Sequence, residues 1–132
     1  MAHVISFRTS RFDVRLEAPN PINPIAGQSV LAWLRPHLAE AGYQSTDPDT
    51  EDWGWYMDVR GTGGSYLVGA SADAGSDQRE IEWVVQIHKH RSLTDKMFGR
   101  HVMTHDDALV SAIERLVRAD GQITDVSVER EA

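Results

Sequence analysis

The chain has 132 residues, 41% of them hydrophobic and 25% charged, which is typical of a folded protein with one hydrophobic core and argues against general disorder. It contains no cysteine, so disulfides, thiolate catalysis and cysteine-based zinc sites are excluded together. Its formal charge of −7 is opposite in sign to that of most nucleic-acid binders, and no apolar run approaches the roughly 20 residues that span a bilayer. We therefore expect a single domain over residues 1–132, located in the cytoplasm, with neither nucleic acid nor membrane as a partner.

The first predicted element is extended and covers residues 3–17. Its apolar residues share one face on either side of Thr9-Ser10, and they are Ile5, Phe7, Phe12, Val14 and Leu16. Two arrangements fit this pattern: a hairpin that turns near Thr9-Ser10, or one long strand with a bulge. Three prolines and two asparagines follow between positions 19 and 24, which excludes both a helix and a central strand there.

A helix is predicted from Gln28 to Ala41. Leucines recur at helical spacing at positions 31, 34 and 38, and Gly42 is a suitable stop. Pro36 lies inside this pattern. Because an interior proline costs about 3 kcal/mol through a lost hydrogen bond and a clash one turn back, we expect a kink or a break there.

An acidic segment follows at positions 45–52. It contains Pro48 and no apolar residue, and its four carboxylates belong to Asp47, Asp49, Glu51 and Asp52. This composition predicts an exposed acidic loop.

Three consecutive segments, 53–60, 66–72 and 79–90, then alternate between apolar and polar residues with a period of two. This period is the one required of strands that bury one face. The run Gly61-Thr62-Gly63-Gly64 separates the first two segments and suits a hairpin turn. The pattern therefore predicts an antiparallel meander of three strands.

The residue pattern in the last part of the chain predicts a second helix and a final strand. Residues 91–103 are irregular, although Leu93, Met97 and Phe98 permit one helical turn. Over 104–120, apolar residues recur at helical spacing, with Thr104 as the expected N-cap and Asp107 in the capping-box position. A short strand is expected at 123–128 with its valines turned inward.

These elements together predict an α+β fold: a mainly antiparallel sheet with a central three-strand meander and two helices packed on one face. The aromatic and histidine side chains divide between the two faces of the sheet. We expect the helices to cover the face with Trp53, Trp55 and Trp83, and the other face to carry Tyr56, Tyr66, His88 and His90.

The histidines offer one chemical hypothesis. His88 and His90 project from the same side of a strand, and His101 and His105 follow within 15 residues. Imidazoles two apart on a strand can chelate a transition metal together with a third ligand from a following loop. The chain lacks an established spacing such as HExxH, so exposed histidines on the polar face of a strand are the favoured interpretation, and we expect no cofactor.

Other catalytic signatures receive no support. The chain has no GxSxG motif, and the glycine-rich run at 61–64 lacks the Gly-Lys-Ser/Thr ending of a phosphate loop and joins two strands. The carboxylates at 47–52 have no apolar neighbour within their segment to raise a pKa, so they do not resemble a glycosidase pair.

The remaining hypothesis is a small acidic, non-enzymatic domain that binds another protein, itself basic. Immunity proteins, which neutralise a toxin made by the same or a neighbouring bacterium, are one class with this size, acidity and fold type. Aromatic anchors with a charged rim are typical of such binding surfaces. The expected contact residues are Asp47, Asp49, Glu51, Asp52, Tyr56 and Tyr66. The alternative is a metal-binding module or metal-dependent enzyme that uses His88, His90, His101 and His105.

Overall fold

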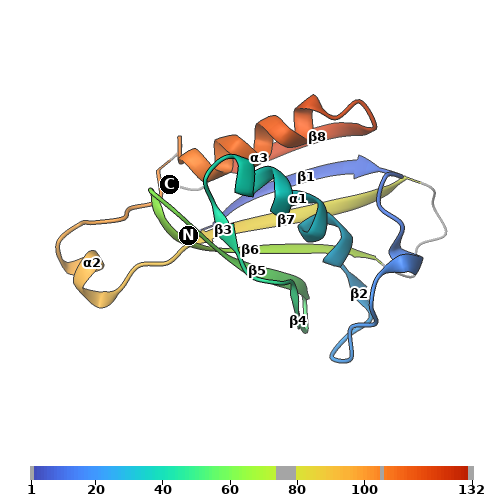
Figure 1. Cartoon of the computed structure of the whole chain (residues 1–132), viewed down its shortest axis with the longest axis horizontal. Helices are drawn as coiled ribbons and strands as arrows, with labels where there is room; N and C mark the ends of the chain where they lie inside the picture. The colour runs from blue at the N-terminus through green and yellow to red at the C-terminus, as the bar shows by residue number, and fades with distance from the viewer. Residues whose placement is uncertain (1, 74–79, 105, 131–132) are drawn as a thin grey trace.

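The computed structural model describes residues 2–73, 80–104 and 106–130 (Figure 1). Within these residues, eight strands form one antiparallel sheet in the order β3-β5-β6-β7-β1-β8, with β2 paired to β6 and β4 paired to β5. The strands are β1 (Ala2–Thr9), β2 (Ile25–Ala26), β3 (Gln44–Ser45), β4 (Asp49–Glu51), β5 (Gly54–Gly61), β6 (Gly64–Asp73), β7 (Ile81–Lys89) and β8 (Ile123–Arg130).

Three α-helices accompany the sheet in the described part of the chain: α1 (Gln28–Glu40), α2 (Leu93–Met97) and α3 (Ala108–Ala119). The two longer helices, α1 and α3, lie over the same face of the sheet, whereas α2 lies beyond the ends of the strands (Figure 1). Nowhere in the described residues is a helix both long enough and apolar enough to cross a membrane.

The predicted meander is confirmed. β5 pairs with β6 and β6 pairs with β7, both antiparallel, with Val59 opposite Tyr66 and Val68 opposite Ile87. The predicted α+β class is confirmed as well, because the buried apolar residues of α1 and α3 join those of the strands in one core. Alternation along the strands places every second side chain in that core, as a period of two requires.

The N-terminal segment differs from both predicted arrangements. β1 ends at Thr9, whose hydroxyl accepts the backbone N–H of Arg11 in a turn that leads the chain out of the sheet. Phe12 then packs edge-on against Trp83, and a short 3-10 helix, η1 (Val14–Leu16), follows. Because β1 already has β7 and β8 on its two sides, a hairpin partner after Thr9 would have no place beside it.

α1 matches its prediction closely and continues through Pro36 without the expected break. Its first residues lack a side-chain cap of their own, and Glu17 supplies one from a distant part of the chain. The Glu17 carboxylate accepts the backbone N–H groups of Gly27 and Ser29 at 3.0 and 2.9 Å. A negative charge at this end also complements the helix dipole.

α3 begins later than predicted. Its N-cap is Asp107, whose carboxylate accepts the backbone N–H of Leu109 at 3.0 Å, and not Thr104. The Thr104 carbonyl instead lies 2.7 Å from Nε2 of the buried His3 on β1, which holds this part of the chain in a non-helical approach to α3. The final strand is confirmed and is longer than expected, with Val126 and Val128 packed against the core.

Candidate functional site

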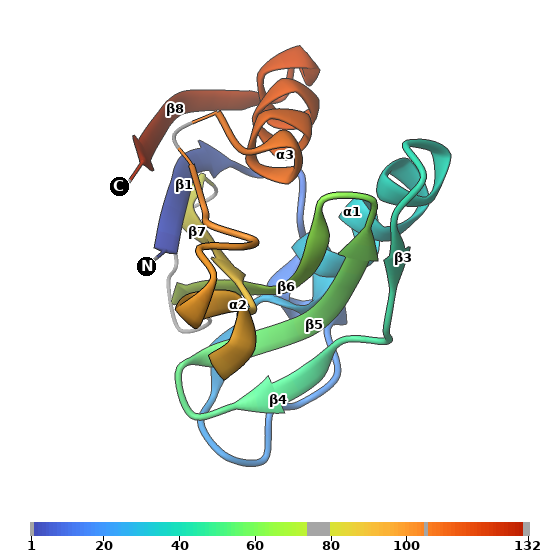
Figure 2. The same ribbon diagram turned by 90° about the vertical axis from the view of Figure 1, so that its left-hand side faces the viewer.

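Strands β5, β6 and β7 present one face to α1 and α3 and turn the other away from them (Figure 2). On this second face, here called the open face, the side chains are half-buried or exposed. They include Tyr56, Asp58, Arg60, Ser65, Leu67, Gln86 and His88. The open face therefore carries aromatic, aliphatic and charged groups on a surface that neither long helix covers.

The acidic segment lies at the edge of the open face and is not the loop that was predicted. β4 pairs with β5 so that Asp49 stands opposite Tyr56 and Glu51 opposite Gly54. We call this unit, with the turn that includes Asp52, the acidic hairpin. Asp49, Glu51 and Asp52 are exposed, as expected, and among the described residues the carboxylates of Glu51 and Asp52 form neither a hydrogen bond nor an ion pair.

Asp47 differs from the three carboxylates of the acidic hairpin. It forms an ion pair with Arg35 of α1, whose guanidinium also donates to the Ser45 hydroxyl. Asp47 therefore fixes α1 against the segment that leads out of β3, and its charge is already matched within the chain.

Trp53 lies on the opposite side of the sheet from the one predicted. Its ring lies over Gly69, where an added Cβ would stand only 2.3 Å from the indole. Gly69 belongs to the open face, since its neighbours Val68 and Ala70 are buried in the core. The turn at 52–53 before β5 breaks the alternation, so only Trp55 and Trp83 are in the core.

Tyr66 is also on the face opposite to the predicted one. It is 1% exposed, and its hydroxyl donates to the Asp107 carboxylate at 3.0 Å. Lys89 completes this buried cluster with its Nζ 3.3 Å from the same carboxylate. Burial, followed by the charge of Asp107 and the hydrogen bond to it, raises the pKa of Tyr66. A side chain held in this way is not available to a partner, so its predicted place in a contact surface is wrong.

Tyr56 remains on the open face, half-buried, between Asp49 of β4 and Gly69 of β6 in the cross-strand register. The ring of Trp53 lies over the same Gly69. Two aromatic side chains and the free carboxylates of the acidic hairpin therefore share one end of the open face, and we call this combination the acidic–aromatic surface.

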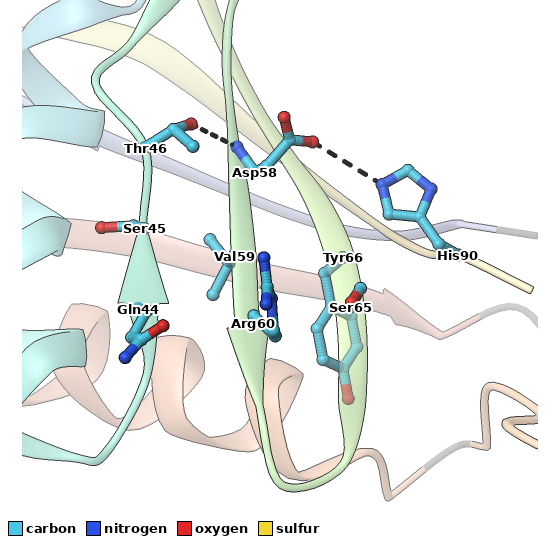
Figure 3. Close-up of a pocket in the computed structure, with 9 residues that line it drawn as sticks. All are labelled: Gln44, Ser45, Thr46, Asp58, Val59, Arg60, Ser65, Tyr66 and His90. Carbon is cyan, nitrogen blue, oxygen red and sulfur yellow. Dashed lines mark hydrogen bonds and ion pairs between the residues drawn. The ribbon is translucent and has the colours of Figure 1, made fainter.

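A polar groove of about 440 Å3 occupies the other end of the open face. Figure 3 shows Asp58 directed toward His90, and Arg60 between Gln44 and Ser65. Nε2 of His90 lies 3.7 Å from Oδ1 of Asp58, and the Arg60 guanidinium is exposed without a hydrogen-bond partner in the described residues. A guanidinium without a partner, with a hydroxyl and an amide beside it, is suited to bind a carboxylate or phosphate group.

The histidines that the structure describes do not come together as the metal hypothesis requires. His88 lies 3.3 Å from Oε1 of Gln86, His90 faces Asp58, and Nδ1 of His101 lies 3.1 Å from Asp95. His105 lies outside the described residues. Within the residues described, no group of three or more His, Asp or Glu side chains is placed to hold a metal ion.

Sequence reasoning missed two features of this region. The period of two correctly places Arg60 on the polar face of its strand. Nothing in the sequence indicates, however, that Gln44 and Ser65 lie beside Arg60 on the neighbouring strands. The Tyr66–Asp107–Lys89 cluster joins residues up to 41 positions apart, and the helix-cap signal at Asp107 gave no indication of its burial.

Comparison with known proteins adds no relative to this picture. No protein-family model, curated protein or solved structure matches the chain. The candidate site therefore rests on the geometry of the open face alone.

Proposed function

We propose that this protein is a non-enzymatic binding domain that recognises a basic protein through the acidic–aromatic surface. An immunity-type inhibitor that neutralises a basic toxin is the class of protein that this proposal favours. One observation carries it: the unpaired carboxylates of the acidic hairpin and two half-buried aromatic side chains lie at the same end of a sheet face that α1 and α3 leave uncovered.

The chemistry of the surface supports a basic partner. The carboxylates of Glu51 and Asp52 are exposed and unmatched among the described residues, so a cationic surface would gain attraction without first breaking an internal ion pair. Charges at a rim act mainly on the rate of association. Aromatic side chains nearer the centre supply most of the contact energy, because they bury a large area with few rotatable bonds.

The strands make this surface well ordered. Tyr56 of β5 is paired on one side with β4 and on the other with β6, and Gly69 leaves a space that the Trp53 ring fills. Side chains held in this way lose little conformational freedom on binding, which favours affinity. The groove beside Arg60 extends the same face and would accept an acidic side chain at the margin of an otherwise basic partner.

The test begins with a partner identified by co-purification. Neutralising Asp49, Glu51 and Asp52 together, as Asn, Gln and Asn, should slow association and flatten its dependence on salt. The matched control removes three exposed carboxylates elsewhere, with Glu40→Gln, Asp125→Asn and Glu129→Gln, and should leave the rate much closer to that of the natural chain.

A second variant separates the aromatic contribution. Tyr56→Ala should raise the dissociation rate by a factor corresponding to about 2 kcal/mol or more if the ring is a central contact. Replacing Tyr66 is not an equivalent test, because its side chain is buried. A partner that binds both the triple variant and Tyr56→Ala with unchanged rates would show that the site lies elsewhere.

A further inference from the structure

Residues 91–102, here called the arm, leave the sheet after β7 and carry α2 out beyond the strand ends (Figures 1 and 2). Their apolar side chains are turned toward solvent. Leu93 is 79% exposed, Met97 73%, Phe98 70% and Val102 47%. Four large apolar side chains so close in the chain form a patch, which is uncommon on a surface that contacts nothing.

The polar groups of the arm, by contrast, bind one another. Ser92 and Asp95 form a reciprocal capping box at the start of α2. The Arg91 guanidinium donates to the carbonyls of Arg100 and Asp95 at 3.0 and 3.3 Å, which ties the two ends of the arm together. The Asp95 carboxylate also contacts His101 at 3.1 Å.

The pKa of Asp95 agrees with its place in these contacts. The backbone N–H of Ser92 and then the His101 ring lower the pKa of this carboxyl, which is consistent with the capping box that it forms with Ser92. The arm is therefore fixed by its polar side chains while its apolar side chains are left in water. This distribution is the reverse of the one found in the rest of the fold.

Burying those apolar side chains would be favourable, since a fully buried Leu, Phe or Met side chain contributes about 1.5–3 kcal/mol. Because the arm is already ordered, little additional conformational entropy would be lost on docking. The structure thus favours an external surface as the binding site for Leu93, Met97 and Phe98.

Charge indicates what that surface is. The arm carries three basic residues, Arg91, Lys96 and Arg100, against the single carboxylate of Asp95, on a chain whose formal charge is −7. Lys96 is exposed and unpaired among the described residues. A surface that complements the arm is apolar at its centre and acidic at its edge, and the acidic–aromatic surface of this same chain has that character.

We propose that the arm is a self-association element that docks on the acidic–aromatic surface of a second copy of this chain. Met97 and Phe98 pack against Trp53 and Tyr56 of the other copy, and Lys96 faces the free carboxylates of its acidic hairpin. If two copies exchange arms about a two-fold axis, the contact closes as a dimer, whereas one-way docking continues into longer assemblies. Either form covers the surface that a basic partner would need, so self-association competes with partner binding.

The first experiment measures the mass of the purified chain in solution over a range of concentrations, by sedimentation or light scattering. The natural chain should associate as concentration rises, and added salt should weaken the association. The Met97→Ser/Phe98→Ser variant should raise the dissociation constant at least tenfold, whereas Leu16→Ser, which removes an apolar side chain that is 84% exposed outside the arm, should not change it. A natural chain that stays monomeric at every concentration overturns the proposal.

Charge reversal identifies the docking surface. Lys96→Glu and Glu51→Lys should each weaken association when studied alone. An equimolar mixture of the two should recover it, because each arm then faces a surface of opposite charge. Failure of the mixture to recover association, while the single variants remain folded by circular dichroism, would show that the arm docks elsewhere and would also overturn the proposal.

Partner binding is measured separately, so the two proposals can fail independently. Arm variants should bind a basic partner at least as well as the natural chain, because they no longer cover the acidic–aromatic surface. If the arm variants lose the partner instead, the arm is itself part of the partner contact, and the proposed competition between self-association and partner binding is wrong.

Discussion

Two clusters of polar and charged side chains lie at the same end of the sheet, and the two lie in opposite environments. On the covered side, Tyr66 and Lys89 face each other across the strands and meet the Asp107 carboxylate, which is almost completely buried. One residue along each strand, Ser65 and His90 lie on the open side, where His90 faces the exposed Asp58. A step of one residue along the chain, from Lys89 to His90, thus changes the surroundings of a carboxylate and its neighbour from the protein interior to water.

The comparison shows that distance alone does not determine what an ion pair contributes. Removing one partner of a buried pair leaves the other charge without compensation, which costs several kcal/mol. Exposed pairs are already solvated and typically contribute about 0–1 kcal/mol. Breaking the covered cluster is therefore expected to destabilise the fold, whereas the open cluster is free to serve in binding.

The largest expected effect comes from Asp107→Ala. This substitution leaves Lys89 buried without its partner, removes the acceptor of Tyr66 and deletes the cap of α3, so we expect a loss of about 3–5 kcal/mol in the free energy of unfolding. Chemical denaturation monitored by tryptophan fluorescence measures it. Asp107→Asn is the matched control, since it keeps an acceptor for Leu109 and should destabilise the protein less than alanine. Equal stability of Asp107→Ala and the natural chain would contradict the stabilising role of the covered cluster.

An intermediate effect is expected from Tyr66→Phe, which keeps the ring and removes the hydroxyl. A hydrogen bond to a charged group contributes about 1.5–3 kcal/mol, and we expect a loss in that range near neutral pH. The pKa of Tyr66 is raised in the folded state, so the stability linked to its neutral hydroxyl is fully present below about pH 10 and is lost as the pH rises above that value.

Denaturation at several alkaline pH values tests this linkage. The natural chain should lose stability steeply above about pH 10, and Tyr66→Phe should show a shallower decline. Some slope should remain, because burial also raises the pKa of Tyr43. Parallel declines for the two proteins would show that the Tyr66 hydroxyl is not responsible.

The smallest effect belongs to the open cluster. Asp58→Asn should change the free energy of unfolding by no more than about 0.5 kcal/mol, because both side chains of the pair are exposed. The measurement is again chemical denaturation, at low and high salt. A loss comparable to that of Asp107→Ala would remove the distinction between the two faces.

Most of the fold was predictable from local patterns. The period of two in residues 53–90 and the leucine spacing before Gly42 are local signals, and the strands and α1 followed from them. The errors arose where tertiary contacts decide the outcome. β1 has no hairpin partner because β7 and β8 already occupy both of its sides, and Asp107 caps α3 because Thr104 is held by His3.

The candidate site was predictable only in part. The exposure of Asp49, Glu51 and Asp52 followed from their composition. The positions of Trp53 and Tyr66 did not, because one turn before β5 moves Trp53 to the open face and because an inward tyrosine hydroxyl can be satisfied by a carboxylate from a distant helix. A single amino-acid sequence does not reveal such a pairing.

The position of β1 has a consequence for how the molecule folds. Ala2 pairs with His88 and His3 pairs with Arg130, so β1 joins residues that are far apart in the chain. Contacts of this kind form only after long loops have closed, and proteins rich in them fold in milliseconds to seconds, roughly. We therefore expect the β5–β7 meander to form early and β1 to be inserted late, so that the strand placed first in the sequence is among the last to find its neighbours.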